Sequence, residues 1–157
     1  MRAFRVALGL VAAMTVASTA RAELLVGLTT NSGITGVNVE VVGKGTSGYI
    51  LLGAYPDDTG YEPENLTGMI GFRRFQGGKA DQNGYFGGGF AGDVDGGPGY
   101  NRFGAGGELG YQWLTDHLRF TLHAGMALAG ESSRGAREGQ TDISPVPHLG
   151  ASVSLRR

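Results

Sequence analysis

Few side chains in this sequence offer catalytic chemistry, and histidines that could pair with serines are the first candidates. Hydrolysis by a serine nucleophile needs a base within hydrogen-bond reach and a third group that orients the base. His123 or His148 could act as the base for Ser152 or Ser154, with Glu108 as the orienting acid. The spacing of these residues does not enforce such a triad, and the sequence has no Gly-x-Ser-x-Gly motif. We therefore expect no catalysis and keep a hydrolase as an alternative.

Two other patterns could bind a cofactor or a metal ion. The order of glycines in residues 87–92 matches the dinucleotide-binding fingerprint. The aspartate, glycine and proline residues that follow cannot form the helix whose N-terminus binds the phosphate. The acidic pairs Asp57 with Asp58 and Asp93 with Asp95 offer too few oxygen ligands for Ca²⁺. The sequence has no cysteine and hence no thiolate metal site. We expect no cofactor and no metal.

The polar candidates recur at every second position, which is typical of β-strands. Residues 102–113 alternate polar or glycine positions with apolar ones, and residues 118–128 repeat the pattern after a tight turn. Strands of soluble proteins usually have about 5–6 residues, whereas tilted strands that cross a bilayer need about 9–11. The length of both segments therefore favours a membrane-spanning β-barrel.

Six further segments fit this fold less regularly. The predicted strands are 24–30, 36–43, 48–55, 66–75, 84–93, 102–113, 118–128 and 146–157. The segment 48–55 is apolar on both faces, so its orientation stays open. Bacterial outer-membrane barrels have an even number of antiparallel strands. We expect an all-β fold, an eight-stranded antiparallel up-and-down transmembrane β-barrel preceded by a cleaved signal peptide.

Residues 1–22 have the features of that signal peptide. Two arginines precede an apolar stretch of about 12 residues, which is too short to span a bilayer as a helix, and small residues stand at Ala20 and Ala22. We expect cleavage before Glu23, with a retained anchor helix as the alternative. Cleavage would leave residues 23–157 as the barrel domain and shift the net charge from −1 to about −4, since three arginines are lost. Neither charge suits a nucleic-acid partner.

One face of the predicted strands collects polar side chains that must then lie inside the barrel. These residues are Glu40, Arg73, Arg102, Glu108, Gln112, Arg119, His123, His148 and Arg156. Buried charges need partners, so we expect Glu40 and Glu108 to pair with Arg73 and Arg119 as a polar plug. The alternative is a narrow pore, although the interior of eight strands is usually filled by side chains. The 30 glycines would leave room for large inward residues.

Aromatic side chains at predicted strand ends suggest contact with a membrane interface. Tyr111 and Trp113 end one strand at the predicted periplasmic rim, and Tyr55 and Phe103 lie near the predicted outer rim. The alternative is ordinary aromatic packing at the edge of a soluble sheet.

The stretch 102–130 (RFGAGGELGYQWLTDHLRFTLHAGMALAG) resembles the paired strands of small eight-stranded bacterial outer-membrane barrels of the OmpA-like and opacity-like group. MIGFRRF (69–75) followed by GYFGGGF (84–90) resembles the preceding hairpin. The resemblance implies a barrel in the outer membrane of a Gram-negative bacterium and no reaction. Such barrels usually end in an aromatic residue that the assembly machinery recognises, whereas this chain ends in Arg157.

The sequence therefore predicts a monomeric outer-membrane protein with a structural or surface-interaction, adhesion-type role. Its expected partners are outer-membrane lipid, the barrel-assembly machinery and a surface partner bound by the outer loops 56–65 and 131–145. One alternative is a lipid-modifying outer-membrane enzyme. The other is a soluble secreted β-barrel for a small apolar ligand, which would require the apolar face of 118–128 to point inward.

Overall fold

The structure is a computed structural model that describes residues 22–55, 66–97, 100–131 and 143–156. The predicted signal peptide, apart from Ala22, lies outside these residues, as do the acidic pair at 57 and 58, most of both predicted outer loops and Arg157. Among the described residues, no helix is long and apolar enough to cross a membrane.

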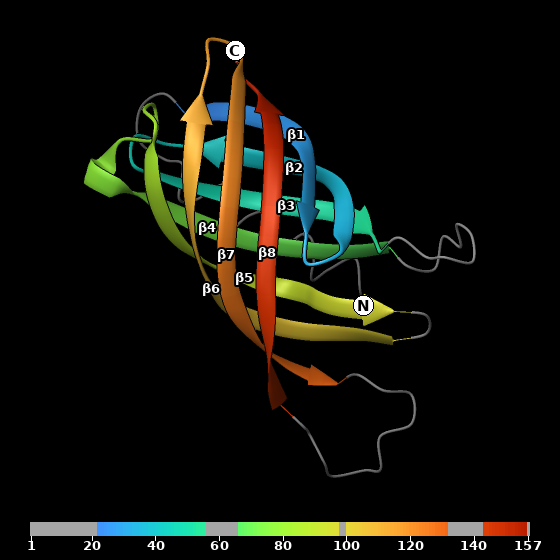
Figure 1. Cartoon of the computed structure of the whole chain (residues 1–157). Helices are drawn as coiled ribbons and strands as arrows, with labels where there is room; N and C mark the ends of the chain where they lie inside the picture. Colours follow the sequence, from blue (N-terminus) through green and yellow to red (C-terminus); the bar gives the residue numbers. More distant parts are fainter. Residues whose placement is uncertain (1–21, 56–65, 98–99, 132–142, 157) are drawn as a thin grey trace.

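Eight antiparallel strands follow one another around a closed barrel in chain order, as Figure 1 shows. Their bounds are β1 (Glu23–Asn31), β2 (Ile34–Val42), β3 (Thr46–Ala54), β4 (Leu66–Phe75), β5 (Gly84–Gly97), β6 (Tyr100–Leu114), β7 (Leu118–Glu131) and β8 (Ile143–Leu155). A short 3-10 turn, η2 (Gln76–Gly78), follows β4. Pairing of β8 with β1 closes the barrel. The predicted all-β, eight-stranded up-and-down barrel is confirmed.

Several predicted strand ends were wrong by two to four residues. The loop expected at 31–35 is a two-residue turn, in which Ser32 and Gly33 have φ angles of 47° and 90°. Positive φ at both central residues is the geometry that favours tight hairpins, and it suits glycine. The pairs β5–β6 and β7–β8 also extend beyond the predicted ends, into residues whose glycines, prolines and charges suggested loops. In these extensions pairing with the neighbouring strand overrides local preference.

The outer face of the barrel is apolar. Large apolar side chains that are at least 40% exposed occur on all eight strands, and they are Leu24, Val26, Leu28, Val37, Val39, Leu52, Leu66, Ile70, Phe72, Tyr85, Phe103, Leu109, Trp113, Phe120, Leu122, Met126, Leu128, Ile143, Leu149 and Leu155. In β3, whose orientation the sequence left open, Tyr49 and Leu51 are buried and Leu52 is 50% exposed.

The interior has apolar side chains toward both ends and polar ones between them. The cluster toward the β1–β2 turn contains Ile34, Tyr49, Leu51, Met69, Phe90, Val94, Ala127, Ala129 and Val146, and the cluster toward η2 contains Leu25, Val42, Phe75, Ala80 and Phe86. In β2, Glu40 stands between Ile34 and Val42, which belong to opposite clusters. The polar middle layer is the candidate functional site.

Candidate functional site

Four charged side chains form a buried ionic network in the middle of the barrel. Glu40, Arg73, Glu108 and Arg119 are each at most 3% exposed. Arg73 Nε lies 2.9 Å from Glu108 Oε1, and Arg73 Nη1 lies 3.5 Å from Glu40 Oε2. Arg119 Nη2 lies 3.2 Å from Glu40 Oε1, which also accepts a hydrogen bond from Ser47. Two acids thus meet two arginines, and the formal charges of the four groups cancel.

Aromatic rings cover the two guanidinium groups. The Arg73 guanidinium carbon lies 4.5 Å from the centre of the Tyr49 ring and 4.7 Å from that of Phe86. The corresponding distance from Arg119 to Phe75 is 4.9 Å. A cation over an aromatic face gains more where water is absent. The network is therefore held between aromatic residues of both apolar clusters.

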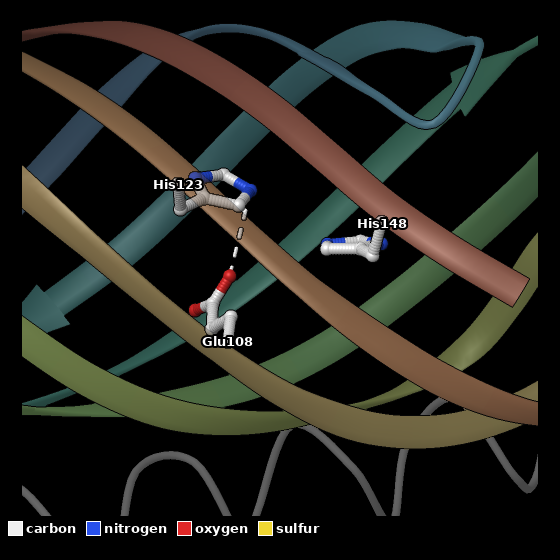
Figure 2. A group of neighbouring side chains, drawn as sticks. All are labelled: Glu108, His123 and His148. Atoms are coloured by element: carbon white, nitrogen blue, oxygen red, sulfur yellow. Dashed lines mark ion pairs between the residues drawn. The ribbon is translucent and has the colours of Figure 1, made fainter.

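Two histidines extend the network toward the β1–β2 turn. His123 Nε2 lies 3.4 Å from Glu108 Oε2 and 3.4 Å from Asn31 Oδ1. His148 Nδ1 lies 3.0 Å from Ser32 Oγ, and the His148 ring stacks on Phe90 with ring centres 4.0 Å apart. The two imidazole rings are also roughly parallel, with centres 5.5 Å apart. Figure 2 shows Glu108 and His123 directed toward one another, with His148 beside them.

Glycines in the strand register create the space for this cluster. Gly125 of β7 pairs with Glu108 on β6 and with His148 on β8, so no side chain stands between these two residues. His123, two residues earlier on β7, pairs with Gly110 and Gly150. A Cβ at Gly150 would come within 2.3 Å of His123 Nε2. The glycine-rich sequence thus lets three large polar side chains of neighbouring strands meet.

Several polar atoms of this cluster lack hydrogen-bond partners among the described residues. They include His123 Nδ1, His148 Nε2 and Glu108 Oε2, although the last atom is in the 3.4 Å ion-pair contact with His123. Buried polar atoms are normally satisfied. Glu108, His123 and His148 each direct a possible ligand atom into one small volume, and these atoms lie within 4.8 Å of one another.

The other predicted interior residues lie toward the barrel ends. The amide of Gln112 is buried and donates to the carbonyl oxygens of Ala80 and Gln82, at 3.0 and 2.6 Å. Arg102 is half-buried and donates to Ser144 Oγ and, at 3.4 Å, to the Ala129 carbonyl. These contacts hold the barrel ends and lie outside the ionic network.

Arg156 also lies outside that network. Its Nε is 3.5 Å from Glu23 Oε1, and both side chains are partly exposed. The pair joins the end of the last strand to the start of the first, and Glu23 lies on the same face of β1 as the buried Leu25.

The serines proposed for hydrolysis form hydrogen bonds with residues other than the histidines. Ser152 Oγ is 2.6 Å from Thr121 Oγ1, and Ser154 Oγ accepts a hydrogen bond from Asn38 at 3.4 Å. The hydroxyl beside His148 belongs to Ser32, which the sequence placed in a loop. The structure therefore brings together Glu108 and both histidines without either expected nucleophile.

Three of the four predicted interface aromatics lie on the outer face. Phe103 and Trp113 are 62% and 45% exposed. Tyr111 contacts Trp113, with ring centres 4.8 Å apart, and Tyr85, with ring centres 4.9 Å apart. Tyr55 differs from the prediction, because it is partly buried and packs against the interior cluster toward the β1–β2 turn.

Sequence reasoning missed Ser32, Ser47, Tyr49 and Phe90 as parts of the site. Ser47 and Tyr49 share a period-two face, and the hydroxyl of Ser47 was the available signal that this face points inward. Phe90 could have been assigned to the interior from its alternation with Phe86, but its stacking on His148 depends on the register between strands. No sequence signal places the turn residue Ser32 beside His148.

When the chain was compared with protein-family models, curated proteins and solved structures, no match was found. The chemistry of the site is therefore inferred from its geometry: a formally neutral ionic network with two imidazoles close to one of its carboxylates, Glu108.

Proposed function

We propose that this chain is an integral outer-membrane β-barrel protein of a Gram-negative bacterium, with a structural or surface-interaction role and no catalysis. The observation that carries the proposal is the distribution of polarity across the barrel wall. Large apolar side chains cover the outside, while Glu40, Arg73, Glu108 and Arg119 are buried inside. Soluble domains rarely expose so extensive an apolar surface, whereas a barrel in lipid requires one.

The lengths of the strands fit the same proposal. The strands have 9 to 15 residues, and a tilted strand needs about 9–11 to cross the hydrocarbon layer. In β4 the outward positions are Leu66, Gly68, Ile70 and Phe72, and a charge, Arg74, appears only at the strand end. These outward residues of β4 form an apolar surface of the kind that membrane lipid contacts. Closure of the barrel also leaves no unpaired strand edge, which lipid would not tolerate.

The filled interior supports a structural role over a channel. Ion pairs in the middle layer and an apolar cluster toward each end occupy the space that an open pore would need. Eight-stranded barrels usually have such filled interiors.

The remaining parts of the proposal follow from the sequence. We infer that residues 1–22 export the chain and are then removed, and that the barrel belongs with the OmpA-like and opacity-like proteins. Its partners would be outer-membrane lipid, the assembly machinery and a surface partner contacted by the loops 56–65 and 131–145. A rigid scaffold that presents variable loops is a common basis for binding. The barrel would act as a monomer.

The geometry gives less support to the two alternatives. A soluble carrier of an apolar ligand would need the apolar face of β7 to point inward, but Leu122, Met126 and Leu128 are each more than half exposed on the outside. A lipid-modifying enzyme would need a nucleophile beside a histidine, and Ser152 and Ser154 are bonded elsewhere.

Cell fractionation combined with a heat-modifiability gel tests the location. We expect the chain in the outer-membrane fraction, without residues 1–22, and with a mobility that changes on boiling because the closed barrel unfolds only then. Recovery from the soluble periplasm without a mobility change would contradict the proposal.

The surface role requires a separate measurement. Replacing residues 56–65 and 132–142 by short Asn-Gly turns is expected to leave the boiling-dependent mobility unchanged and to lower adhesion of producing cells. Equal adhesion by cells with equal amounts of the two folded barrels would contradict a loop-mediated interaction and leave only a structural role.

A further inference from the structure

We propose that Glu108, His123 and His148 bind one divalent transition-metal ion of the Zn²⁺ class inside the barrel. Two imidazole nitrogens and one carboxylate oxygen form a common set of three protein ligands for Zn²⁺, with a fourth position left open. Harder ions such as Mg²⁺ prefer oxygen ligands only. This inference goes beyond the structural role and differs from the expectation from sequence of no metal. It holds whether or not the barrel lies in a membrane.

The distances between the three ligand atoms require a small contraction of the cluster. Ligand atoms about 2.0–2.1 Å from a tetrahedral ion lie roughly 3.3–3.5 Å from one another. His123 Nε2 and Glu108 Oε2 are already 3.4 Å apart, and a ligand atom of His148 completes a triplet within 4.8 Å. The three side chains enter the interior from the neighbouring strands β6, β7 and β8 (Figure 2). His148 must therefore approach, and Gly125 leaves the path between it and Glu108 free of a side chain. His123 Nε2 must in addition exchange its 3.4 Å hydrogen bond with Asn31 Oδ1 for the ion, its proton then lying on Nδ1.

The hydrogen bonding of the buried ligand atoms supports an ion more directly than the short distances between them. His148 Nε2 has no hydrogen-bond partner within the described part of the chain, and Glu108 Oε2 has only the 3.4 Å ion-pair contact with His123 Nε2. The two residues are 1% and 2% exposed. Leaving a buried polar atom unpaired costs about 1–3 kcal/mol. Coordination of one ion would satisfy His148 Nε2 and give Glu108 Oε2 a stronger partner than its 3.4 Å contact with His123.

Supporting hydrogen bonds already orient two of the ligands. Arg73 Nε holds Glu108 Oε1 at 2.9 Å, which leaves Oε2 for the ion. Ser32 Oγ lies 3.0 Å from His148 Nδ1 and accepts a hydrogen bond from the Leu149 amide. If His148 Nδ1 donates to Ser32, the lone pair of Nε2 is free to coordinate. Metal-bound histidines commonly use their second nitrogen in this way.

The surroundings also predict how the ion would behave. The four charges of the ionic network cancel, so an anionic fourth ligand such as hydroxide or chloride would offset part of the added charge. Apolar clusters lie toward both ends of the interior, so the ion would enter during folding and leave slowly from the folded barrel.

The test uses the untagged chain refolded in detergent with Zn²⁺ present, followed by removal of free metal and measurement of zinc per chain. We expect one zinc per folded wild-type chain, retained in excess Mg²⁺, lost slowly to a chelator and released at once on unfolding. His148→Gln and His123→Gln are expected to lower Zn²⁺ affinity more than about 100-fold, beyond the usual effect of losing a supporting hydrogen bond. A folded wild-type barrel that retains no zinc would overturn the proposal.

The third histidine of the chain provides a matched control. His117 is exposed in the turn between β6 and β7, so His117→Gln is expected to leave zinc binding unchanged. Loss of zinc in this variant, or full binding by the folded His148→Gln chain, would each contradict the site. If a ligand variant fails to fold, X-ray absorption of the zinc-loaded wild type remains decisive. Two imidazoles and an oxygen at about 2.0–2.2 Å are expected, and a spectrum without imidazole ligands would overturn the proposal.

Ser32 tests the supporting hydrogen bond separately from the ligands. Its φ of 47° suits glycine, so Ser32→Gly removes the hydroxyl without adding backbone strain. We expect Zn²⁺ affinity to fall about 10- to 100-fold while the boiling-dependent gel mobility is unchanged. Unaltered affinity would contradict a role of Ser32 in orienting His148.

Discussion

At the scale of single residues, the interior depends on a few carboxylates that each satisfy several partners. Glu40 contacts Arg73 and Arg119 and accepts a hydrogen bond from Ser47, all away from water. Removing one partner of a buried ion pair is more costly than the pair's net stabilisation, because the remaining charge is left without compensation in a dry environment. The sequence predicted that acids and arginines would pair here, but it could not assign one acid to both arginines, because that depends on side-chain reach across the lumen.

Glu40→Gln should therefore destabilise the barrel by about 3–5 kcal/mol, since two buried guanidinium groups lose a charged partner. Urea unfolding of the chain in detergent micelles measures this free energy. The matched control is Glu23→Gln, in an ion pair with Arg156 that is partly exposed and spans 3.5 Å. Exposed pairs contribute at most about 1 kcal/mol, so a small change is expected there. Equal effects of the two substitutions would show that Glu40 is not in a dry network.

At the scale of strands, alternation of polar and apolar residues predicted which face points inward in β6 and β7, including where the strand ends were misplaced, but it left the orientation of β3 open. In β6 and β7 the polar positions face the interior as the period-two pattern predicts. Register is different, because it depends on turn geometry and on pairing between strands. The two-residue turn at Ser32 and Gly33 sets the pairing of β1 with β2 and carries Ser32 to His148. A periodic pattern within one strand contains no such information.

The glycines show why register matters. A Cβ at Gly125 would lie 2.0 Å from the Gly107 carbonyl oxygen and 2.9 Å from the Glu108 Cα, whereas a Cβ at Gly107 would meet only an ordinary contact at 3.6 Å. Gly125→Ala should therefore force β6 and β7 apart and destabilise the barrel by about 1–3 kcal/mol, as overpacking does. Gly107→Ala should have little effect. Denaturant unfolding of the two variants makes the comparison, and similar stabilities would contradict the close approach of these strands.

At the scale of the whole molecule, the barrel has a polar middle layer inside an apolar outer surface. In water this arrangement would leave large apolar side chains of every strand exposed, which is unfavourable by roughly 25 cal/mol for each Å². In lipid the same apolar surface carries no such free-energy penalty. The buried ion pairs stabilise one particular packing of side chains inside the barrel. If lipid surrounds the barrel, both the apolar outer surface and the polar interior are explained. Substitutions on the outer face of β4 test directly whether lipid surrounds it.

Ile70 and Leu66 both face outward from β4, one at its centre and the other at its end, and are 42% and 72% exposed. An arginine facing lipid costs about 2–4 kcal/mol at the bilayer midplane and about 0–1 kcal/mol near the interface. Ile70→Arg should therefore destabilise the barrel in lipid vesicles several times more than Leu66→Arg, as measured by reversible unfolding. Arg74 at the opposite end of β4 is consistent with tolerance of charge at the rim. If water surrounded the barrel, arginine would be tolerated at both positions, and equally small effects in vesicles would contradict a membrane-spanning β4.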